Sequence, residues 1–235
     1  MFRTRRLVLK ALWLCNAFAG LFYKCYLFFA RGVDVSLLAD LNVWQRRNLR
    51  LGRNVTVRRG CIIDAPGGSA ITLGDGVTIK ENVHLLTYGG PGIAVGARTT
   101  VNSFCILYGH GGLTIGRDCL IAPMCVFIPA NHVFDDTRVP ISRQGVKCKG
   151  IRVGDNCWLG TKVTVLDGIT IGDNCVIGAG AVVTHDIPPD SIAVGVPARV
   201  VKTRGEGIDH GGHGAHGGCT ERKEVFPEFS AVTMR

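Results

Sequence analysis

Aliphatic residues recur at every sixth position through most of this chain. One uninterrupted stretch of such positions consists of Val153, Leu159, Val165, Ile171, Ile177 and Val183. A helix repeats near 3.6 residues and a strand near two, so a period of six fits neither element alone. It fits a coil of three short strands, each of which directs one aliphatic side chain into a shared interior. The pattern therefore predicts an all-β fold, a parallel β-helix.

The same register recurs upstream, and it accounts for most of the cysteines. The upstream aliphatic positions are Leu51, Val57, Ile63, Leu73, Ile79, Leu85, Val95, Val101, Leu107, Ile115, Ile121 and Phe127. The position four after an aliphatic residue is expected to turn inward at a corner. These corner positions are Val55, Cys61, Val77, Val83, Cys105, Cys119, Cys125, Cys157, Val163, Ile169, Cys175 and Ala181. Six of the ten cysteines are therefore predicted to pack as small hydrophobic side chains, which favours a reducing, cytosolic compartment.

The spacing of the coils locates a segment that departs from the repeat. Coil starts are 22, 22 and 20 residues apart from Leu51 to Ile115, whereas the next start, Val153, follows after 38. One coil therefore carries an insertion of about twenty residues, which we place at 129–150. Long loops on a rigid scaffold are usually functional. The groups in this loop that can bind or catalyse are His132, Asp135, Asp136, Arg138, Arg143 and Gln144.

The positive charge lies mostly before the predicted β-helix domain, which spans residues 49–204. The first fifty residues contain nine Lys or Arg against two Asp, which accounts for +7 of the formal net charge of +9. The nearly neutral body argues against nucleic acid as a partner. The 13 residues between Lys10 and Lys24 are uncharged but too few to span a membrane, and no signal cleavage site follows them. We expect residues 1–48 to form a helical segment, and residues 1–30 to lie on an anionic membrane surface. The alternative is that this segment caps the end of the β-helix.

The end of the chain differs in composition from the repeats. Residues 205–235 contain a Gly- and His-rich stretch without aliphatic periodicity, which predicts a disordered, flexible tail. His210, His213 and His216 could chelate a metal ion, but a linker is the favoured interpretation.

Several motifs give the chain a resemblance to a known family. They are Val101-Asn102, Ile115-Gly116-Arg117-Asp118-Cys119, Asn131-His132-Val133-Phe134-Asp135, Ile151 to Gly160 and Val194-Gly195-Val196-Pro197-Ala198-Arg199. Over roughly residues 50–204 the chain resembles the left-handed β-helix acyltransferases of the hexapeptide-repeat superfamily, in particular the sugar and polysaccharide O-acetyltransferases. The resemblance implies a left-handed helix and a homotrimer with active sites between subunits. It also implies that acetyl-CoA lies along a groove beside the coils and that no metal is required.

The resemblance also implies roles for individual residues. His132 matches the family's catalytic histidine, in a His-x-x-Asp element completed by Asp135. A sugar hydroxyl is a poor nucleophile near neutral pH, and an imidazole can take its proton as it attacks the thioester. The residues predicted to bind the acceptor are Asn102, His110 and Arg138. The residues predicted to bind acetyl-CoA are Trp158, Gly160, Thr161, Gly178, Ala179, Arg199, Lys202 and Arg204.

The acceptor region departs from the family pattern in one place. Seven residues after the asparagine that matches Asn102, the galactoside-type enzymes carry an aspartate that helps to hold the acceptor. Here that position is Gly109, followed by His110. The departure implies an acceptor other than a free galactoside or maltose. His110 either lines the acceptor pocket or is a surface residue of the 109–112 turn.

We therefore expect an acetyl-CoA-dependent O-acetyltransferase that acts on a glycan, either a surface polysaccharide or its lipid-linked precursor. It is expected in the cytoplasm, on the inner face of the cytoplasmic membrane. One alternative is a zinc enzyme like the γ-class carbonic anhydrases, because His84, His110 and His132 are spaced near the coil period. Against it, the sequence lacks the closely spaced histidine pair of that class. A non-catalytic β-helix scaffold is the other. The sequence leaves open the acceptor sugar, the hydroxyl modified and the length of the acyl group.

Overall fold

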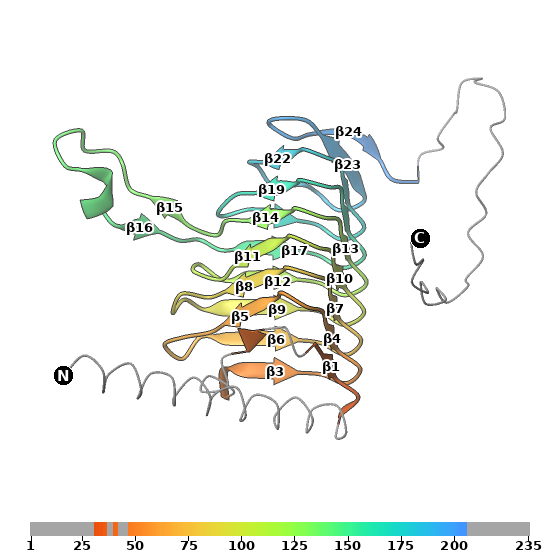
Figure 1. The fold of residues 1–235 in the computed structure, drawn as a ribbon. Helices are drawn as coiled ribbons and strands as arrows, with labels where there is room; N and C mark the ends of the chain where they lie inside the picture. The colour runs from red at the N-terminus through yellow and green to blue at the C-terminus, as the bar shows by residue number, and fades with distance from the viewer. Residues whose placement is uncertain (1–30, 37–39, 42–46, 206–235) are drawn as a thin grey trace, which may run out of the picture.

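The protein is a parallel β-helix whose coils stack along one axis (Figure 1). The computed structural model describes residues 31–36, 40–41 and 47–205. Sheet A contains β1 (Asp34–Val35), β4 (Thr56–Val57), β7 (Thr78–Ile79), β10 (Thr100–Val101), β13 (Leu120–Ile121), β18 (Trp158–Leu159), β21 (Val176–Ile177), β23 (Ser191–Val194) and β24 (Arg199–Thr203). Sheet B contains β2 (Asp40–Leu41), β5 (Ile62–Asp64), β8 (His84–Leu86), β11 (Ile106–Tyr108), β14 (Val126–Phe127), β19 (Thr164–Val165) and β22 (Val182–Val183). Sheet C contains β3 (Leu49–Leu51), β6 (Ala70–Leu73), β9 (Gly92–Val95), β12 (Leu113–Ile115), β17 (Ile151–Val153) and β20 (Thr170–Ile171).

The six-residue pattern correctly predicted the core. Every aliphatic position named above is buried, and so is every corner position four residues later. Strands of successive coils pair in parallel, so that Ile121 lies in register with Leu159 and Leu159 with Ile177. Burying one such side chain contributes about 1.5–3 kcal/mol. The column of aliphatic side chains is therefore the main source of stability in the stack.

The six corner cysteines are buried, as predicted, and their thiols also make hydrogen bonds. The Cys157 thiol donates to the Gly172 carbonyl oxygen of the next coil at 3.1 Å, and the Cys175 thiol donates to Pro188 O at 3.0 Å. A thiol here fills the space of a small hydrophobic side chain and satisfies a carbonyl group that points into the corner.

The β-helix begins earlier than the predicted boundary at residue 49. β1 pairs with β4 and β2 pairs with β5, so the first coil includes residues from Asp34 onward. Val33 and Val35 are buried in this coil. The predicted N-terminal helix, its membrane or capping role, and the predicted disordered tail with its three histidines fall almost entirely outside the described residues. Within the described part of the chain, no helix is long and apolar enough to cross a membrane.

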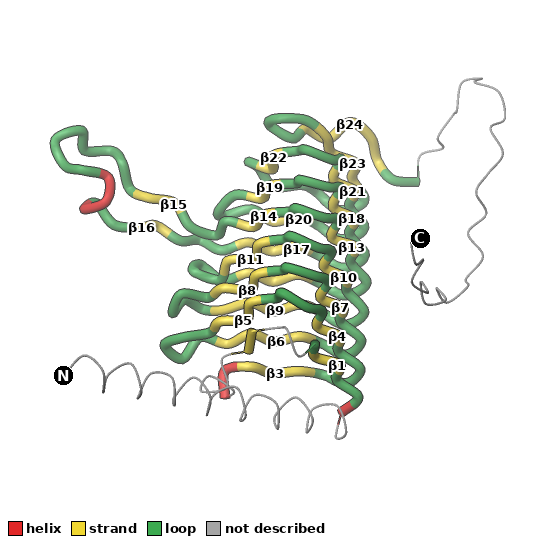
Figure 2. The backbone as a smooth tube through the Cα atoms, viewed as in Figure 1, coloured by secondary structure: helices red, strands yellow, loops and turns green. Residues whose placement is uncertain are grey.

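The predicted insertion at 129–150 is an extruded loop, which projects away from the stack in Figures 1 and 2. Its two arms form a short antiparallel pair, β15 (Asn131–His132) and β16 (Val146–Lys147), with His132 in register with Val146. A single turn of 3-10 helix, η2 (Ile141–Arg143), lies near the tip. Pro129, at the base of the loop, is buried, and every residue from 130 to 150 is half-buried or exposed.

Candidate active site

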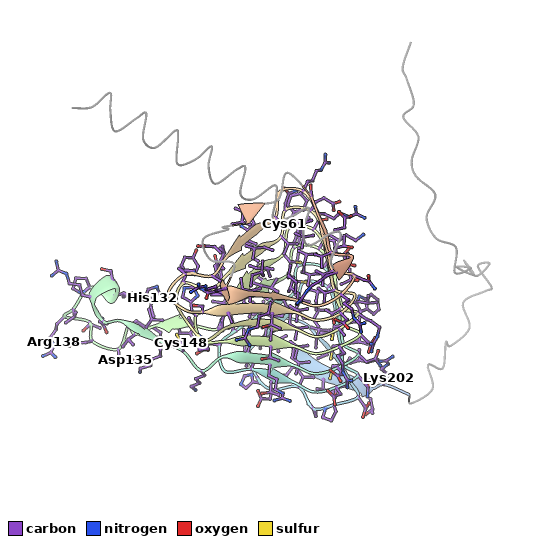
Figure 3. All side chains as sticks on the ribbon, turned by 90° about the horizontal axis from the view of Figure 1, so that it is seen from below. Cys61, His132, Asp135, Arg138, Cys148 and Lys202 are labelled. Carbon is purple, nitrogen blue, oxygen red and sulfur yellow. The ribbon has the colours of Figure 1, made fainter. Side chains whose placement is uncertain are left out.

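The corners of the coil organise the predicted site residues. We name each corner by the sheets that it joins in chain order: the A/B corner, the B/C corner and the C/A corner. The loop leaves the stack at the B/C corner, between β14 of sheet B and β17 of sheet C. Figure 3 shows His132 and Cys148 toward the base of the loop, with Asp135 and Arg138 farther out.

The side chain of His132 is exposed at this place and unengaged. Among the described residues, its imidazole makes no hydrogen bond or ion pair. The Asp135 carboxylate lies 3.6 Å from Lys147 Nζ instead, and both of these side chains are exposed. Within one chain, the structure therefore shows no hydrogen bond or ion pair between His132 and Asp135. Sequence reasoning missed Lys147, because contacts inside a non-repeating loop leave no periodic signal.

The outer part of the loop is held by its own polar side chains. The Gln144 amide accepts a hydrogen bond from the Asp136 backbone N–H at 3.1 Å and donates to the carbonyl oxygens of Asp136 and Val139 at 2.8 and 2.7 Å. The Arg138 guanidinium donates to both Asp136 carboxylate oxygens, at 3.0 and 2.9 Å. These bonds lower the pKa of the Asp136 carboxyl group, so that the pair is charged at neutral pH. Arg138, a predicted acceptor-binding residue, is therefore already paired.

A second group of predicted residues lies at the A/B corner. Asn102, Gly160 and Gly178 follow β10, β18 and β21 of sheet A, at equivalent positions of their coils. A Cβ atom on Gly160 would lie 2.6 Å from the backbone nitrogen of Ala179. Glycine is therefore required for the close stacking of these coils, and Gly160 is itself buried beneath the next coil.

Polar and aromatic side chains lie beside these glycines at the A/B corner. The Thr161 hydroxyl donates to Pro123 O at 2.8 Å, and the Asn102 amide donates to Ile121 O at 2.9 Å. The indole of Trp158 lies on the outer face of sheet A and is 54% exposed. These contacts fix Thr161 and Asn102 and leave the Trp158 ring available to a ligand.

The three predicted phosphate-binding cations lie on or after β24, but at different corners. Arg199 is in register with Val194, whose side chain contacts Gly178, so this end of β24 lies at the A/B corner. The Arg204 guanidinium donates to the Asn174 carbonyl oxygen at 3.2 Å, at the C/A corner. Lys202 lies between these ends, on the side of the stack away from the loop (Figure 3). The structure therefore groups Arg199 with the A/B corner and separates Arg204 from it.

The B/C corner holds His110 and a partner that sequence reasoning missed. The rings of His110 and Tyr88 stack with centroids 4.5 Å apart at 22°, and Tyr108 meets the imidazole edge-on at 5.5 Å. His110 Nδ1 is buried without a hydrogen-bond partner, and burial lowers the pKa of the imidazole. The missed signal is the spacing: Tyr88 and His110 are 22 residues apart, which is one coil.

A shallow depression of about 310 Å³ adjoins this corner on the outer face of sheet C. Lys149 and Arg152 line it, together with four glycines, Gly111, Gly112, Gly150 and Gly168. The Asp167 carboxylate accepts hydrogen bonds from the backbone N–H groups of Lys149 and Gly150 at 2.8 and 2.9 Å, and so anchors the end of the loop. Within the described residues, no three His, Cys, Asp or Glu side chains gather closely enough to hold a metal ion.

Known proteins share both the sequence pattern and the fold. Residues 150–185 match the family model described as the hexapeptide repeat of succinyl-transferase. A probable acetyltransferase of Mycobacterium tuberculosis is 38% identical over 168 residues, which are 71% of this chain and 54% of that protein. A putative lipopolysaccharide biosynthesis O-acetyltransferase of Escherichia coli K12 is 30% identical over 162 residues, 66% of this chain and 71% of the relative. The chain thus spans about half the length of the first relative and most of the second.

A solved structure supports the same assignment. The crystal structure of a hexapeptide-repeat acetyltransferase from Vibrio cholerae, in complex with acetyl-CoA, is 29% identical and aligns with a TM-score of 0.51. The alignment covers 57% of this chain and 70% of that one. From its repeats, its left-handed parallel β-helix and these relatives, the chain belongs to the hexapeptide-repeat acetyltransferase family.

Proposed function

We propose that the protein transfers an acetyl group from acetyl-CoA to a hydroxyl group of a glycan, with His132 as the general base. The observation that carries the proposal is the exposed, unengaged imidazole of His132 on a loop that leaves the stack. The relatives support the reaction class, because one is named for lipopolysaccharide biosynthesis and another holds acetyl-CoA. The proposed acceptor is a surface polysaccharide or its lipid-linked precursor.

The A/B corner fits the donor. Gly160 and Gly178 let the coils stack closely here, and the exposed side chains of Trp158 and Thr161 beside them offer contacts to an extended donor. Arg199, at the end of the corner, offers a guanidinium group for phosphate oxygens. Acetyl-CoA supplies the activated acetyl group as a thioester. The residues of the chain bind and orient it.

His132 supplies the proton acceptor. Neutral imidazole is suited to take the proton of an acceptor hydroxyl as that oxygen attacks the thioester carbonyl, and to pass a proton to the departing sulfur. Asn102 lies at the A/B corner, where its amide would contact the acceptor beside the thioester. The reaction then needs no covalent intermediate on the protein.

We propose further that the site is completed between subunits of a homotrimer. In one chain, His132 belongs to a loop at the B/C corner, whereas Asn102, Trp158 and Gly160 belong to the A/B corner, with sheet B between them. A second copy whose A/B corner faces this loop would bring the two groups together. Ring closure of such a head-to-tail contact is a common route to cyclic oligomers. The exposed apolar side chains of the loop, Phe134 and Ile141 among them, suit such a contact.

The location of the protein is proposed from the sequence alone. Arg3, Arg5, Arg6 and Lys10 precede an apolar stretch rich in Leu, Phe and Trp. Such a segment favours the surface of an anionic membrane, where a lipid-linked glycan would be presented. We place the enzyme on the inner face of the cytoplasmic membrane.

Two measurements test the proposed reaction. Purified protein should bind acetyl-CoA in calorimetry, and mass spectrometry of surface glycans should show the loss of one acetyl group per repeat in cells that lack the gene. Complementation with the wild-type gene should restore the acetyl group, and the His132→Ala gene should not. Unchanged glycans together with no acetyl-CoA binding would contradict the proposal.

A further inference from the structure

Three aromatic rings form one cluster at the B/C corner. Tyr88 follows β8, and Tyr108 and His110 lie at the end of β11 and just after it, so the rings come from two successive coils. Tyr88 stacks on His110 at 4.5 Å, Tyr108 meets His110 edge-on at 5.5 Å, and the two tyrosine rings are 5.9 Å apart. Pairs at these distances stabilise one another, so the cluster is a preformed surface.

Tyr88 is the exposed member of the cluster, whereas Tyr108 and His110 are half-buried. Tyr88 is 58% exposed, and its backbone has φ of +49°, a conformation in which tyrosine is uncommon. A turn of this kind would normally carry Gly or Asn. Phe104 and Met124 also combine a positive φ with an exposed side chain, so the stacking of Tyr88 on His110, and not its φ, distinguishes this position.

The cluster lies beside the base of the loop. Glycines follow His110, and a Cβ atom on Gly111 would overlap Pro129 O and approach Cys148 Cβ at the base of the loop. The segment that follows His110 therefore packs against the base of the loop that carries His132, and this loop leaves the stack one coil later. A ligand lying across the rings can extend directly toward that loop.

The chemistry of the cluster selects one class of ligand. Burial keeps the His110 imidazole neutral at pH 7 by lowering its pKa, and no acidic or basic side chain stacks with the three rings. A neutral aromatic surface suits the face of a pyranose ring, where several C–H groups point the same way, while the tyrosine hydroxyls can bond to the sugar hydroxyls at its edge. The three rings themselves carry no positive charge that would select a phosphate or carboxylate group.

We propose that Tyr88, Tyr108 and His110 form a stacking subsite for a pyranose ring of an extended glycan, next to the sugar that is acetylated. This inference rests on the proposed function and deepens it, because it makes the acceptor an oligosaccharide or polysaccharide. The subsite binds a sugar that does not react, so it raises affinity for long acceptors and leaves single sugars unaffected. His110 stacks on one face of the Tyr88 ring and holds it in place. It needs no direct contact with the reacting atoms.

The test compares a short and a long glycan on the full-length protein without acetyl-CoA. The probes are the monosaccharides and tetrasaccharides of glucose, mannose and N-acetylglucosamine, titrated by saturation-transfer NMR. Tyr88→Asn removes the ring and suits the positive φ, Tyr88→Phe keeps the ring, and Ile62→Ala alters an exposed apolar residue elsewhere on sheet B. Thermal melts confirm that each variant is folded.

At least one tetrasaccharide should bind the wild type about tenfold more tightly than its monosaccharide, as expected for one well-stacked ring. Tyr88→Asn should abolish this gain, whereas Tyr88→Phe and Ile62→Ala should keep most of it. No preference for any tetrasaccharide, an unchanged preference in Tyr88→Asn, or an equal loss in Tyr88→Phe would overturn the proposal.

Acetyl-CoA binding, measured separately, distinguishes this inference from the proposed function. We expect Tyr88→Asn to bind acetyl-CoA like the wild type. A wild type that binds acetyl-CoA but shows no tetrasaccharide preference would refute the subsite alone, and a wild type that fails to bind acetyl-CoA would refute the proposed function. A loss of acetyl-CoA binding in Tyr88→Asn would assign the rings to the donor and overturn the subsite.

Discussion

At the scale of single residues, His132 is expected to matter most for turnover. His132→Ala should lower kcat by about two orders of magnitude or more, the usual effect of removing a general base. Asp135→Asn should cost less, because in one chain its carboxylate contacts Lys147 and not the imidazole. Acetyl transfer can be followed by the release of free CoA thiol, with the exposed Ser142→Ala as control. Near wild-type turnover in His132→Ala would refute the proposed base.

The corner cysteines permit a test of stability rather than activity. Cys157→Arg should prevent folding or lower the free energy of unfolding by several kcal/mol, since it would bury a charge without a partner. Cys157→Ser should cost about 1–2 kcal/mol, because its hydroxyl can still donate to the Gly172 carbonyl oxygen as the thiol does at 3.1 Å. Urea unfolding followed by circular dichroism measures both. A stable, fully folded Cys157→Arg protein would contradict the assigned register.

Burial could be predicted from the sequence with little error, since each inward position repeats. Leu159 and Cys157 are buried because their neighbours six and 18 residues away follow the same rule. Contacts that do not repeat from coil to coil could not be predicted from the sequence. The ion pair of Asp135 with Lys147 depends on how a loop folds back on itself, and periodicity says nothing about that.

At the scale of elements, the loop is the part whose rigidity should affect catalysis. Gln144→Ala removes three hydrogen bonds that tie the Gln144 side chain to the backbone of Asp136 and Val139. We expect about a tenfold lower kcat, since a mobile loop holds His132 less well, with the KM for acetyl-CoA nearly unchanged. Faster hydrogen exchange across residues 133–145 should accompany the change.

Arg143→Ala is the matched control, because it alters the neighbouring, exposed side chain in the same loop. It should leave both exchange and kcat close to wild type. A Gln144→Ala protein with faster exchange but full activity would show that the loop does not need to be rigid, and would contradict the link between the two.

The extrusion of the loop could be predicted from the coil spacing, but the start of the β-helix could not. Between Val153 and Val183 every sixth residue is aliphatic, whereas the first coil carries its buried Val33 and Val35 ahead of any complete repeat. A pattern must recur before it can be recognised, so the terminal coil of a solenoid is the hardest one to find. The Tyr88–His110 stack, by contrast, follows the coil period and lay within reach of the same reasoning.

At the scale of the whole molecule, the separation of the two corner groups can be tested by mixing inactive subunits. His132→Ala disables the loop, and Thr161→Trp obstructs the A/B corner with a bulky side chain at an exposed position. If each site takes its loop from one subunit and its corner from the next, a random equimolar mixture of the two variants should regain about a quarter of wild-type activity, because one site in four combines two intact parts. Sedimentation should show trimers throughout.

The same mixture gives a clear opposite outcome. If both groups acted within one chain, every site would carry one of the two defects, and mixing would restore nothing. Each variant must first be shown to be folded and trimeric on its own, so that loss of assembly is not mistaken for loss of the site.

A membrane location would be a property of the assembly as well as of the sequence. Basic side chains near an anionic leaflet contribute about 1 kcal/mol each, and three copies of residues 1–30 would act together. Full-length protein should sediment with anionic liposomes and be released in part by high salt, while a variant lacking residues 1–30 should remain in the supernatant with its acetyl-CoA binding intact. Full-length protein that stays in the supernatant would favour the capping role.

The regular stacking of the coils fixes the distances between equivalent residues along the A/B corner. Neighbouring strands in a sheet are about 4.8 Å apart, so the equivalent positions Asn102, Ala122, Gly160 and Gly178 mark off three steps of fixed size. A complete coil inserted between Asn102 and Gly160 would bury its own aliphatic side chains and fold, yet it would displace one end of the proposed donor site by one full step. If the donor lies along this corner as proposed, coils can be added near the ends of the stack, whereas the interval from Asn102 to Gly178 must match the length of the donor.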